Sequence, residues 1–317
     1  MFRALLESGA PILADAAIET RIMFETSLKL DPHLQVAALL EKPRGRQALR
    51  DVYSTYLDVA WAHGLPLVTG TPTFRASARY VERAGAGGAD TVRRLNAEAV
   101  AFLNEIRDDG EHEPVFIAGV VGPYGDAYTP GDCLGHLDGA DYHLEQVRAL
   151  TEAGVDLLHG PTFPSVDEAH GVAIAMATTK LPYAIGFTLD HRGRVLDGTR
   201  LRDAISRIDG SVAREPAWYA VTCVHPHVAH IALDELASTG PRELARLKEF
   251  KANGSRLSAV ALAQLDHPES DSPDDFGEAL DRLGREFDLQ ILGGCCGTDS
   301  THLAALARRL EARRVED

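Results

Sequence analysis

Two hydrophobic patterns alternate along the chain: short runs of apolar or β-branched residues, and longer stretches whose apolar residues recur at helical spacing. The short runs are typical of buried strands and the longer stretches of amphipathic helices. The predicted strands span residues 11–14, 65–69, 115–120, 155–159, 183–188, 218–222, 256–262 and 289–292. The predicted helices span residues 51–63, 90–107, 142–153, 165–178, 228–238, 274–287 and 299–313. Such alternation indicates βα units around a parallel sheet.

This pattern predicts one closed α/β (β/α)8 TIM barrel, with residues 1–317 as a single domain. An open, doubly wound sheet is the alternative, but that fold normally has a glycine-rich turn after its first strand. The segment Ala14-Asp15-Ala16-Ala17, which follows the first predicted strand, contains no glycine. In barrel enzymes the loops after the strands carry the active site, so we look for function there.

The charge balance indicates which class of ligand the chain can bind. The chain has 32 Lys and Arg residues against 47 Asp and Glu residues, a formal net charge of −15. Nucleic acid binding requires clustered cations that neutralise phosphates, so we exclude that partner and expect small molecules. The N-terminal segment lacks the apolar core of a signal peptide, and no window reaches the roughly 18 apolar residues of a membrane span. We expect a cytoplasmic protein without a membrane partner, and a homo-oligomer stays open.

Two of the four cysteines are adjacent, in the run Gly293-Gly294-Cys295-Cys296-Gly297. Adjacent cysteines do not form an ordinary structural disulfide with each other, which favours a reducing compartment. The run lies between the last predicted strand and the last predicted helix. Both thiols therefore lie near a helix N-terminus, whose partial positive charge favours thiolates.

A third thiol, Cys223, follows the sixth predicted strand. In a closed barrel this places it on the same rim as Cys295 and Cys296. Three protein ligands with an open fourth position are typical of a catalytic zinc ion. Buried cysteines also serve as small apolar residues without a metal, and the spacing alone leaves both interpretations open. The fourth cysteine, Cys133, lies in a Gly/Pro/Asp-rich loop and receives no role.

These residues resemble the homocysteine S-methyltransferases, a family that includes betaine-dependent and S-methylmethionine-dependent enzymes and the homocysteine module of cobalamin-dependent methionine synthase. The zinc-binding end of that family reads GGCCGT, and it stands unbroken at residues 293–298. Further blocks follow the family's order. Asp15 with Thr20 resembles D-G-x-x-x-T, residues 70–77 resemble T-N-T-F/Y-x-A-S, residues 118–125 resemble A-G-S-x-G-P-Y-G, and residues 195–198 resemble L-x-D-G.

The resemblance implies a zinc-dependent S-methyltransferase of the EC 2.1.1 class, with no catalytic group beyond the metal site. Its implied reaction moves a methyl group from an onium donor (S-methylmethionine, S-adenosylmethionine or betaine) to homocysteine and gives methionine, as in methionine biosynthesis. The implied Zn²⁺ ligands are Cys223, Cys295 and Cys296. The implied substrate contacts are Asp15, Thr73 and Phe74.

Three positions depart from the family pattern. Thr222 stands where the family has Asn before the zinc cysteine, and Ala16 where it has Gly after the first aspartate. Pro161 precedes Thr162 where the family has the Glu that grips the amino group of homocysteine. A buried ammonium without a partner is costly. Either another acid replaces this Glu, for which Glu19 is a candidate, or the acceptor is a different thiol.

Three histidines, His225, His227 and His230, closely follow the predicted ligand Cys223. Histidine is the commonest metal ligand. Alternation along one loop nevertheless prevents all three from reaching one ion. We expect surface or supporting roles for them, with His230 on a helix.

Aromatic residues near the motifs have two interpretations. Phe74, Phe163 and Trp218 either line a pocket for an onium donor through cation–π contacts or belong to the core. The chain does not identify the donor. A diverged barrel that binds zinc or thiols without catalysis is a further, non-enzymatic possibility.

Overall fold

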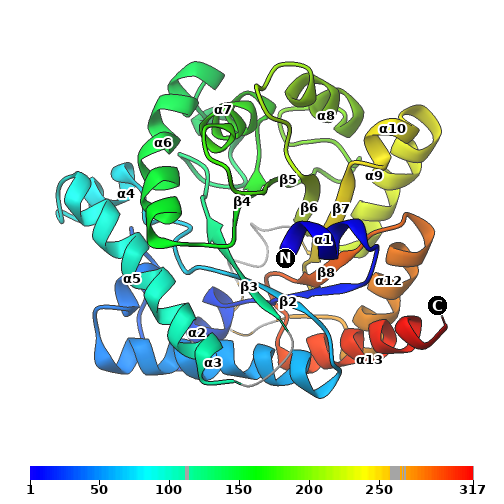
Figure 1. The fold of residues 1–317 in the computed structure, drawn as a ribbon, viewed down its shortest axis with the longest axis horizontal. Coiled ribbons are helices and arrows are strands. Elements are labelled where there is room, and N and C mark those ends of the chain that lie inside the picture. Colours follow the sequence, from blue (N-terminus) through cyan, green and yellow to red (C-terminus); the bar gives the residue numbers. More distant parts are fainter. Residues whose placement is uncertain (111–113, 258–264, 266, 268, 317) are drawn as a thin grey trace.

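The computed structural model describes residues 1–110, 114–257, 265, 267 and 269–316. Its strands are parallel and close into a barrel in chain order, with β1 paired to both β2 and β8 (Figure 1). The strands are β1 Ile12–Ala14, β2 Leu67–Gly70, β3 Val115–Val120, β4 Leu157–Phe163, β5 Tyr183–Phe187, β6 Trp218–Val224, β7 Leu247–Ala252 and β8 Ile291–Gly294. The predicted (β/α)8 barrel is therefore confirmed.

Helices surround the barrel, and α3 and α13, far apart in the sequence, lie side by side (Figure 1). The longer helices are α3 Pro43–Ala62, α5 Ala89–Asp108, α6 His136–Ala153, α7 Val166–Ala177, α8 Leu201–Asp209, α9 Pro226–Thr239, α12 Pro273–Glu286 and α13 Ser300–Glu316. The shorter segments are α1 Phe2–Glu7, α2 Glu19–Glu25, η1 Val36–Leu39, α4 Ala78–Arg83, η2 Pro130–Asp132 and α10 Pro241–Leu244. Of the longer helices, α8 is absent from the sequence prediction. Within the described ranges, no helix combines the length and apolar character needed to cross a membrane.

The sequence pattern misplaces the seventh strand. The predicted range is 256–262, whereas β7 is Leu247–Ala252; residues 256 and 257 form a bend, and 258–262 lie outside the described residues. Two charged side chains of β7 project into the barrel, where Glu249 contacts Trp218 of β6 and Lys251 contacts Asp15 after β1. Charged residues inside the barrel break the apolar run by which a buried strand is recognised.

The N-terminal end of the barrel is apolar and closed by α1, which lies across the barrel in Figure 1. The ring of Phe2 lies 4.9 Å from that of Phe116 and 5.4 Å from that of Trp218, centroid to centroid. Gln290 donates a hydrogen bond from Nε2 to the carbonyl oxygen of Leu5 at 2.9 Å, which fastens α1 to the barrel. The opposite end, formed by the C-terminal ends of the strands, is thus the place for a site.

Candidate functional site

Three cysteine sulfurs meet at the C-terminal ends of β6 and β8. Cys223 lies in β6, and Cys295 and Cys296 directly follow β8. Their Sγ atoms lie within 4.8 Å of one another and form the group of possible metal ligands found in the described part of the chain. Cys223 and Cys295 are joined by a disulfide, and Cys296 is free. The fold therefore brings the predicted ligands together, but the disulfide has to be reduced before all of them can bind a metal.

Two non-glycine residues adopt left-handed backbone on this rim. Thr162 in β4 has a φ of 56° and Cys223 in β6 has a φ of 55°, and the pairing register of each strand shifts there. Such irregularities re-aim side chains, and this backbone conformation costs on the order of 1–3 kcal/mol for a residue with a Cβ. The amide of Thr162 donates a hydrogen bond to Oγ1 of Thr222 at 3.0 Å. This bond couples the two irregular strand ends.

The glycines of the cysteine motif are required because other chain segments pass very close to them. A Cβ at Gly293 would lie 2.6 Å from the carbonyl oxygen of Ala14, and one at Gly294 would lie 2.2 Å from Oγ1 of Thr298. Neither approach is possible for real atoms, so any side chain would displace the neighbouring segment. The motif is therefore needed for packing as well as for its thiols.

Backbone hydrogen bonds hold the cysteine pair after β8. The amide of Cys295 donates to the carbonyl oxygen of Ala252 at 2.7 Å, and the carbonyl oxygen of Cys296 accepts from the amide of Gly254 at 2.9 Å. Both partners belong to β7 or the residues just after it. The end of β7 thus fixes the position of both thiols.

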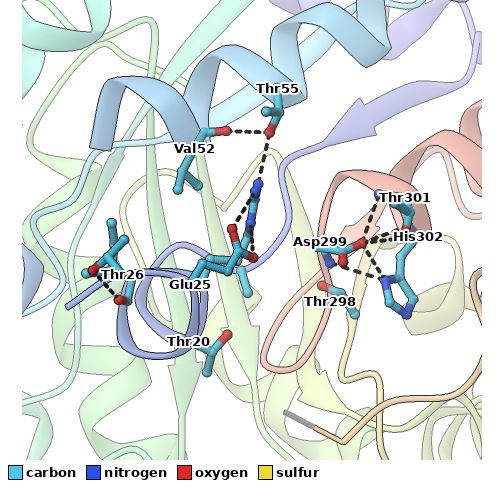
Figure 2. A network of polar contacts seen from close by, with 12 residues as sticks. Thr20, Glu25, Thr26, Val52, Thr55, Thr298, Asp299, Thr301 and His302 are labelled. Carbon is cyan, nitrogen blue, oxygen red and sulfur yellow. Dashed lines mark hydrogen bonds and ion pairs between the residues drawn. The ribbon is translucent and has the colours of Figure 1, made fainter. Parts of the chain in front are cut away.

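Figure 2 shows a polar network at the start of α13, directly after the cysteine pair. Asp299 accepts hydrogen bonds from the amide of Thr301 and from Nδ1 of His302, both at 2.8 Å. Nε2 of His302 lies 3.0 Å from the carbonyl oxygen of Asp271. The bond with His302 lowers the pKa of Asp299 well below its usual value. Burial opposes protonation of His302, but its two hydrogen bonds outweigh burial and raise its pKa.

The thiol of Cys296 shares its surroundings with Glu19 and Tyr128. Burial, together with the charge of Glu19, raises the pKa of Cys296 to about 11, and the Tyr128 hydroxyl is a hydrogen-bond partner. Burial also raises the pKa of Glu19 to about 7. The Oε1 atom of Glu19 is buried without a hydrogen-bond partner among the described residues. This carboxyl therefore lies near Cys296, with Arg75 as a charged neighbour and with Oε1 free of hydrogen bonds among the described residues.

The donor set fits zinc. Protein zinc sites take thiolates at about 2.3 Å in tetrahedral geometry, which places the sulfurs about 3.8 Å apart. The three sulfurs lie within 4.8 Å of one another with Cys223 and Cys295 joined, so reduction and a small separation of that pair would give this spacing. The raised pKa of Cys296 means that its thiol keeps its proton without a metal, and a divalent cation supplies the charge that removes it.

The predicted substrate contact Asp15 is paired within the protein. Its Oδ2 accepts hydrogen bonds from the Thr69 hydroxyl at 3.0 Å and from the Gly70 amide at 2.7 Å. Its Oδ1 contacts the ammonium group of Lys251 from β7. Asp15 is 3% exposed. It lies on the predicted rim, but with a cationic partner that the motifs do not suggest.

A second polar group lies deeper in the barrel. Nε1 of Trp218 donates to Oε2 of Glu249 at 2.7 Å, and the same oxygen lies 3.4 Å from Nε2 of His159. Burial lowers the pKa of His159, so this ring is neutral near pH 7. Trp218 and Phe163 are fully buried, which agrees with the core interpretation of both residues.

The two other predicted substrate contacts, Thr73 and Phe74, differ in accessibility. Thr73 is buried, and its Oγ1 donates to the carbonyl oxygen of Val120 at 2.7 Å. Phe74 is partly exposed and packs on Gly122, where a Cβ would lie 2.3 Å from the Phe74 carbonyl oxygen. Thr73 thus holds two strand ends together, whereas Phe74 keeps a side chain that a ligand can reach.

The histidines after Cys223 have partners other than a metal. His225 is the N-cap of α9: its Nδ1 accepts from the amide of His227 at 3.1 Å, and its Nε2 lies 2.8 Å from Oδ2 of Asp271. His227 is exposed. His230 lies on α9, with Nε2 3.4 Å from Oε2 of Glu286. These contacts agree with supporting and surface roles.

A buried carboxylate fastens the loop that carries Tyr128. Oε1 of Glu168 accepts from the amide of Tyr124 at 2.5 Å and lies 2.9 Å from Nε2 of His143. Cys133 belongs to the same loop, and burial together with the charge of Glu168 raises its pKa. Cys133 is therefore a protonated thiol of this loop and lies outside the sulfur group.

Comparisons with known proteins identify similar methyltransferases. The model of the family described as homocysteine S-methyltransferase matches residues 12–310. The homocysteine S-methyltransferase of Escherichia coli is 25% identical over 97% of both chains, and homocysteine S-methyltransferase YbgG of Bacillus subtilis is 24% identical over 97% of this chain and 98% of its own. Selenocysteine Se-methyltransferase of Brassica oleracea is 20% identical over 99% of this chain and 93% of its own.

The fold has a solved counterpart. The homocysteine methyltransferase MmuM from Escherichia coli, in a metallated and in an oxidized form, has a TM-score of 0.78, 22% identity, and coverage of 97% of this chain and 99% of that chain. These relatives are methyltransferases, and this chain is likewise a methyltransferase of the EC 2.1.1 class, built on a closed barrel with a thiol cluster on its C-terminal rim. The chain belongs to the homocysteine S-methyltransferase family.

Three residues of the site are missing from the sequence prediction: Lys251, Glu249 and Tyr128. The available signal for Lys251 and Glu249 was their spacing by two in a stretch of mixed apolar and charged residues, since a strand places residues spaced by two on one face. Tyr128 lies in a loop, where no periodic signal exists.

Proposed function

We propose that this chain transfers a methyl group from an onium donor to the thiol of homocysteine, giving methionine, and that Cys223, Cys295 and Cys296 hold a Zn²⁺ ion for this reaction. The observation that carries the proposal is the convergence of the three sulfurs within 4.8 Å on the barrel rim. Membership of the family supports it.

When bound, zinc supplies the charge that converts the acceptor thiol, whose pKa is otherwise near 8.5, into a thiolate. The acceptor sulfur forms a bond to the methyl carbon while the bond from that carbon to the onium atom breaks. The onium atom keeps the bonding electron pair and so loses its positive charge. No general acid is needed, because the leaving sulfur or nitrogen atom takes up the electron pair and no proton.

The chain's own residues position these reactants. Tyr128 places its hydroxyl next to Cys296, where it can donate a hydrogen bond to the sulfur. Phe74 offers a reachable aromatic side chain on the same rim. The closed N-terminal end of the barrel leaves the sulfur rim as the route by which acceptor and donor enter.

A methyl-transfer assay tests the proposal. Reduced, zinc-loaded protein is incubated with homocysteine and, in separate reactions, with S-methylmethionine, S-adenosylmethionine or betaine, and methionine and bound zinc are measured. We expect methionine from at least one donor and one zinc ion per chain. The Cys296→Ser variant should lose both, whereas the matched control Cys133→Ser should keep both.

Two outcomes contradict the proposal. A variant without the three cysteines that is metal-free and fully active would exclude the zinc mechanism. A thiol that enters the cobalt-substituted site, with no methyl transfer from any donor, would identify a thiol-binding barrel without catalysis.

A further inference from the structure

We propose that Lys251 determines acceptor specificity: the pocket recognises the carboxylate end of the thiol acceptor and does not recognise an ammonium group. This inference rests on one part of the proposed function, namely that the acceptor thiol binds at the cysteine rim. It concerns Asp15 and Lys251, which lie at the polar end of that rim.

The first step concerns Asp15, which is no longer free for a ligand cation. A carboxylate offers about four lone-pair positions. In Asp15 three are used, by Thr69, Gly70 and Lys251. A ligand ammonium placed against Asp15 would also lie beside the Lys251 ammonium, and like charges in a poorly solvated site repel strongly. The geometry therefore disfavours an amino group at this position.

The end of β4, on the same rim, supplies no replacement charge. Pro161 has neither an ionisable side chain nor an N–H group. Thr162 is buried, and its hydroxyl has no hydrogen-bond partner among the described residues. A neutral hydroxyl serves a carboxylate oxygen as a donor. This edge of the rim is thus compatible with an anionic or neutral ligand group.

Lys251 itself can bind a carboxylate. Its ammonium group has three N–H donors, and its hydrogen bond within the described structure goes to Asp15. The side chain is 19% exposed, compared with 4% for that of Asp15, so the accessible member of the ion pair is the cation. The remaining N–H groups can donate to ligand oxygens.

The deeper carboxylate, Glu249, does not offset this charge for a ligand. It is 2% exposed and accepts the indole hydrogen bond of Trp218 from one side. Glu249 is also two residues before Lys251 on β7, and therefore further from the rim. A ligand on the rim meets the lysine first.

Glu19 is the rival ammonium partner, since its Oε1 is unpaired and it lies near Cys296. Arg75 already acts on Glu19 as a cation, so a ligand ammonium would have to share this carboxyl with a second positive charge. The two arrangements give opposite results with acceptors that lack one end of homocysteine.

The kinetic test compares three thiols on reduced, zinc-loaded protein: homocysteine, 4-mercaptobutanoate, which lacks the amino group, and 3-aminopropane-1-thiol, which lacks the carboxylate. A site built to grip an amino group rejects the analogue without it by about 10⁴-fold. We expect kcat/KM for 4-mercaptobutanoate to lie within about tenfold of that for homocysteine, and the aminothiol to lose about 100-fold or more. Rejection of 4-mercaptobutanoate by about 10⁴-fold would overturn the inference.

The Lys251→Met variant tests the residue. It should lower kcat/KM for 4-mercaptobutanoate by about 100-fold and, by freeing Asp15, shift preference towards homocysteine. Lys248→Met is the matched control, because Lys248 lies on the same strand and pairs at 2.6 Å with Asp288 on the outside. If folded Lys251→Met keeps the acceptor preference of the native chain, the assignment to Lys251 is wrong. The assignment is also wrong if only Glu19→Gln loses the preference for homocysteine.

A binding measurement separates this inference from the proposed function and needs no engineered variant. Calorimetry compares methionine with 4-(methylthio)butanoate, the corresponding thioether without the amino group. Similar affinities, within about tenfold, support recognition through the carboxylate even if no methyl transfer is found. Binding of methionine alone would overturn the inference even if the enzyme methylates homocysteine.

Discussion

Thr298 donates a hydrogen bond from Oγ1 to the carbonyl oxygen of Cys295 at 2.6 Å, across the turn that presents both Cys295 and Cys296. Groups that orient metal ligands typically contribute 10- to 100-fold to metal affinity. We expect Thr298→Val, which keeps the shape and removes the hydroxyl, to weaken zinc binding by about tenfold or more. Thr298→Ser should retain near-native affinity. Competition with a zinc indicator measures both, and equal affinities in the two variants would contradict this role.

The close approach of β8 to β1 gives a prediction for stability. Gly293→Ala would place a Cβ 2.6 Å from the carbonyl oxygen of Ala14, so one strand must move. We expect a loss of about 1–3 kcal/mol in the free energy of unfolding, measured by urea denaturation. Gly131→Ala is the control, because a Cβ there meets no atom within 4 Å. Equal stability of the two variants would show that β8 does not approach β1 as closely as this distance indicates.

The buried carboxylate of Glu168 gives a second prediction for stability. In Glu168→Gln the side-chain NH₂ group can take the place of Oε1. It then faces the backbone amide of Tyr124 or the ring of His143, and a buried group is left without a partner. The expected loss is about 2–4 kcal/mol, with reduced methyl transfer because the loop carries Tyr128. In Glu105→Gln, whose partner Arg46 is on the surface, the loss should stay below about 1 kcal/mol. A small effect in Glu168→Gln would mean that the loop is held by other contacts.

The pair of Asp299 and His302 predicts a pH dependence of stability. The raised pKa of His302 gives stability that is present below its unfolded value of 6.5 and is lost as pH rises through the raised folded value. The lowered pKa of Asp299 gives stability that is present above 3.8 and is lost as pH falls through the lowered value.

The difference in unfolding free energy between the native chain and His302→Gln should therefore be largest between about pH 4.5 and 6.5 and shrink on both sides. Urea denaturation across this range measures it. His230→Gln, which removes an exposed histidine paired at 3.4 Å with Glu286, should give a nearly flat difference. A His302→Gln difference that does not change with pH would exclude the ion pair.

The disulfide between Cys223 and Cys295 predicts that metal binding depends on reduction. Thiolates bind zinc, whereas a disulfide does not offer them. We expect the oxidised protein to bind little zinc, and reduction followed by removal of the reductant to give one zinc ion per chain by elemental analysis. Thiol titration after zinc binding should show protection of these cysteines. Zinc binding of equal stoichiometry before and after reduction would contradict a site formed by all three thiols.

Local sequence patterns indicated much of the fold and the meeting of the three cysteines on one rim. Alternating apolar periods indicated βα units, and the order of strands in a closed barrel placed Cys223 on the same rim as Cys295 and Cys296. This works because each cysteine follows a recognisable strand, so topology alone brings them together. The close approach that requires glycine at 293 and 294 was visible only in the structure.

Only the tertiary structure revealed the contact between Asp15 and Lys251 at the polar end of the rim. Asp15 and Lys251 are separated by 236 positions, and no motif connects them. Their contact arises because β1 and β7 both flank β8 in the closed barrel. The same charged side chains hid β7 from the hydrophobic pattern, since a strand with Glu249 and Lys251 inside the barrel does not look buried. Local periodicity reports which face of an element is apolar, whereas the pairing of distant charges depends on how the barrel closes.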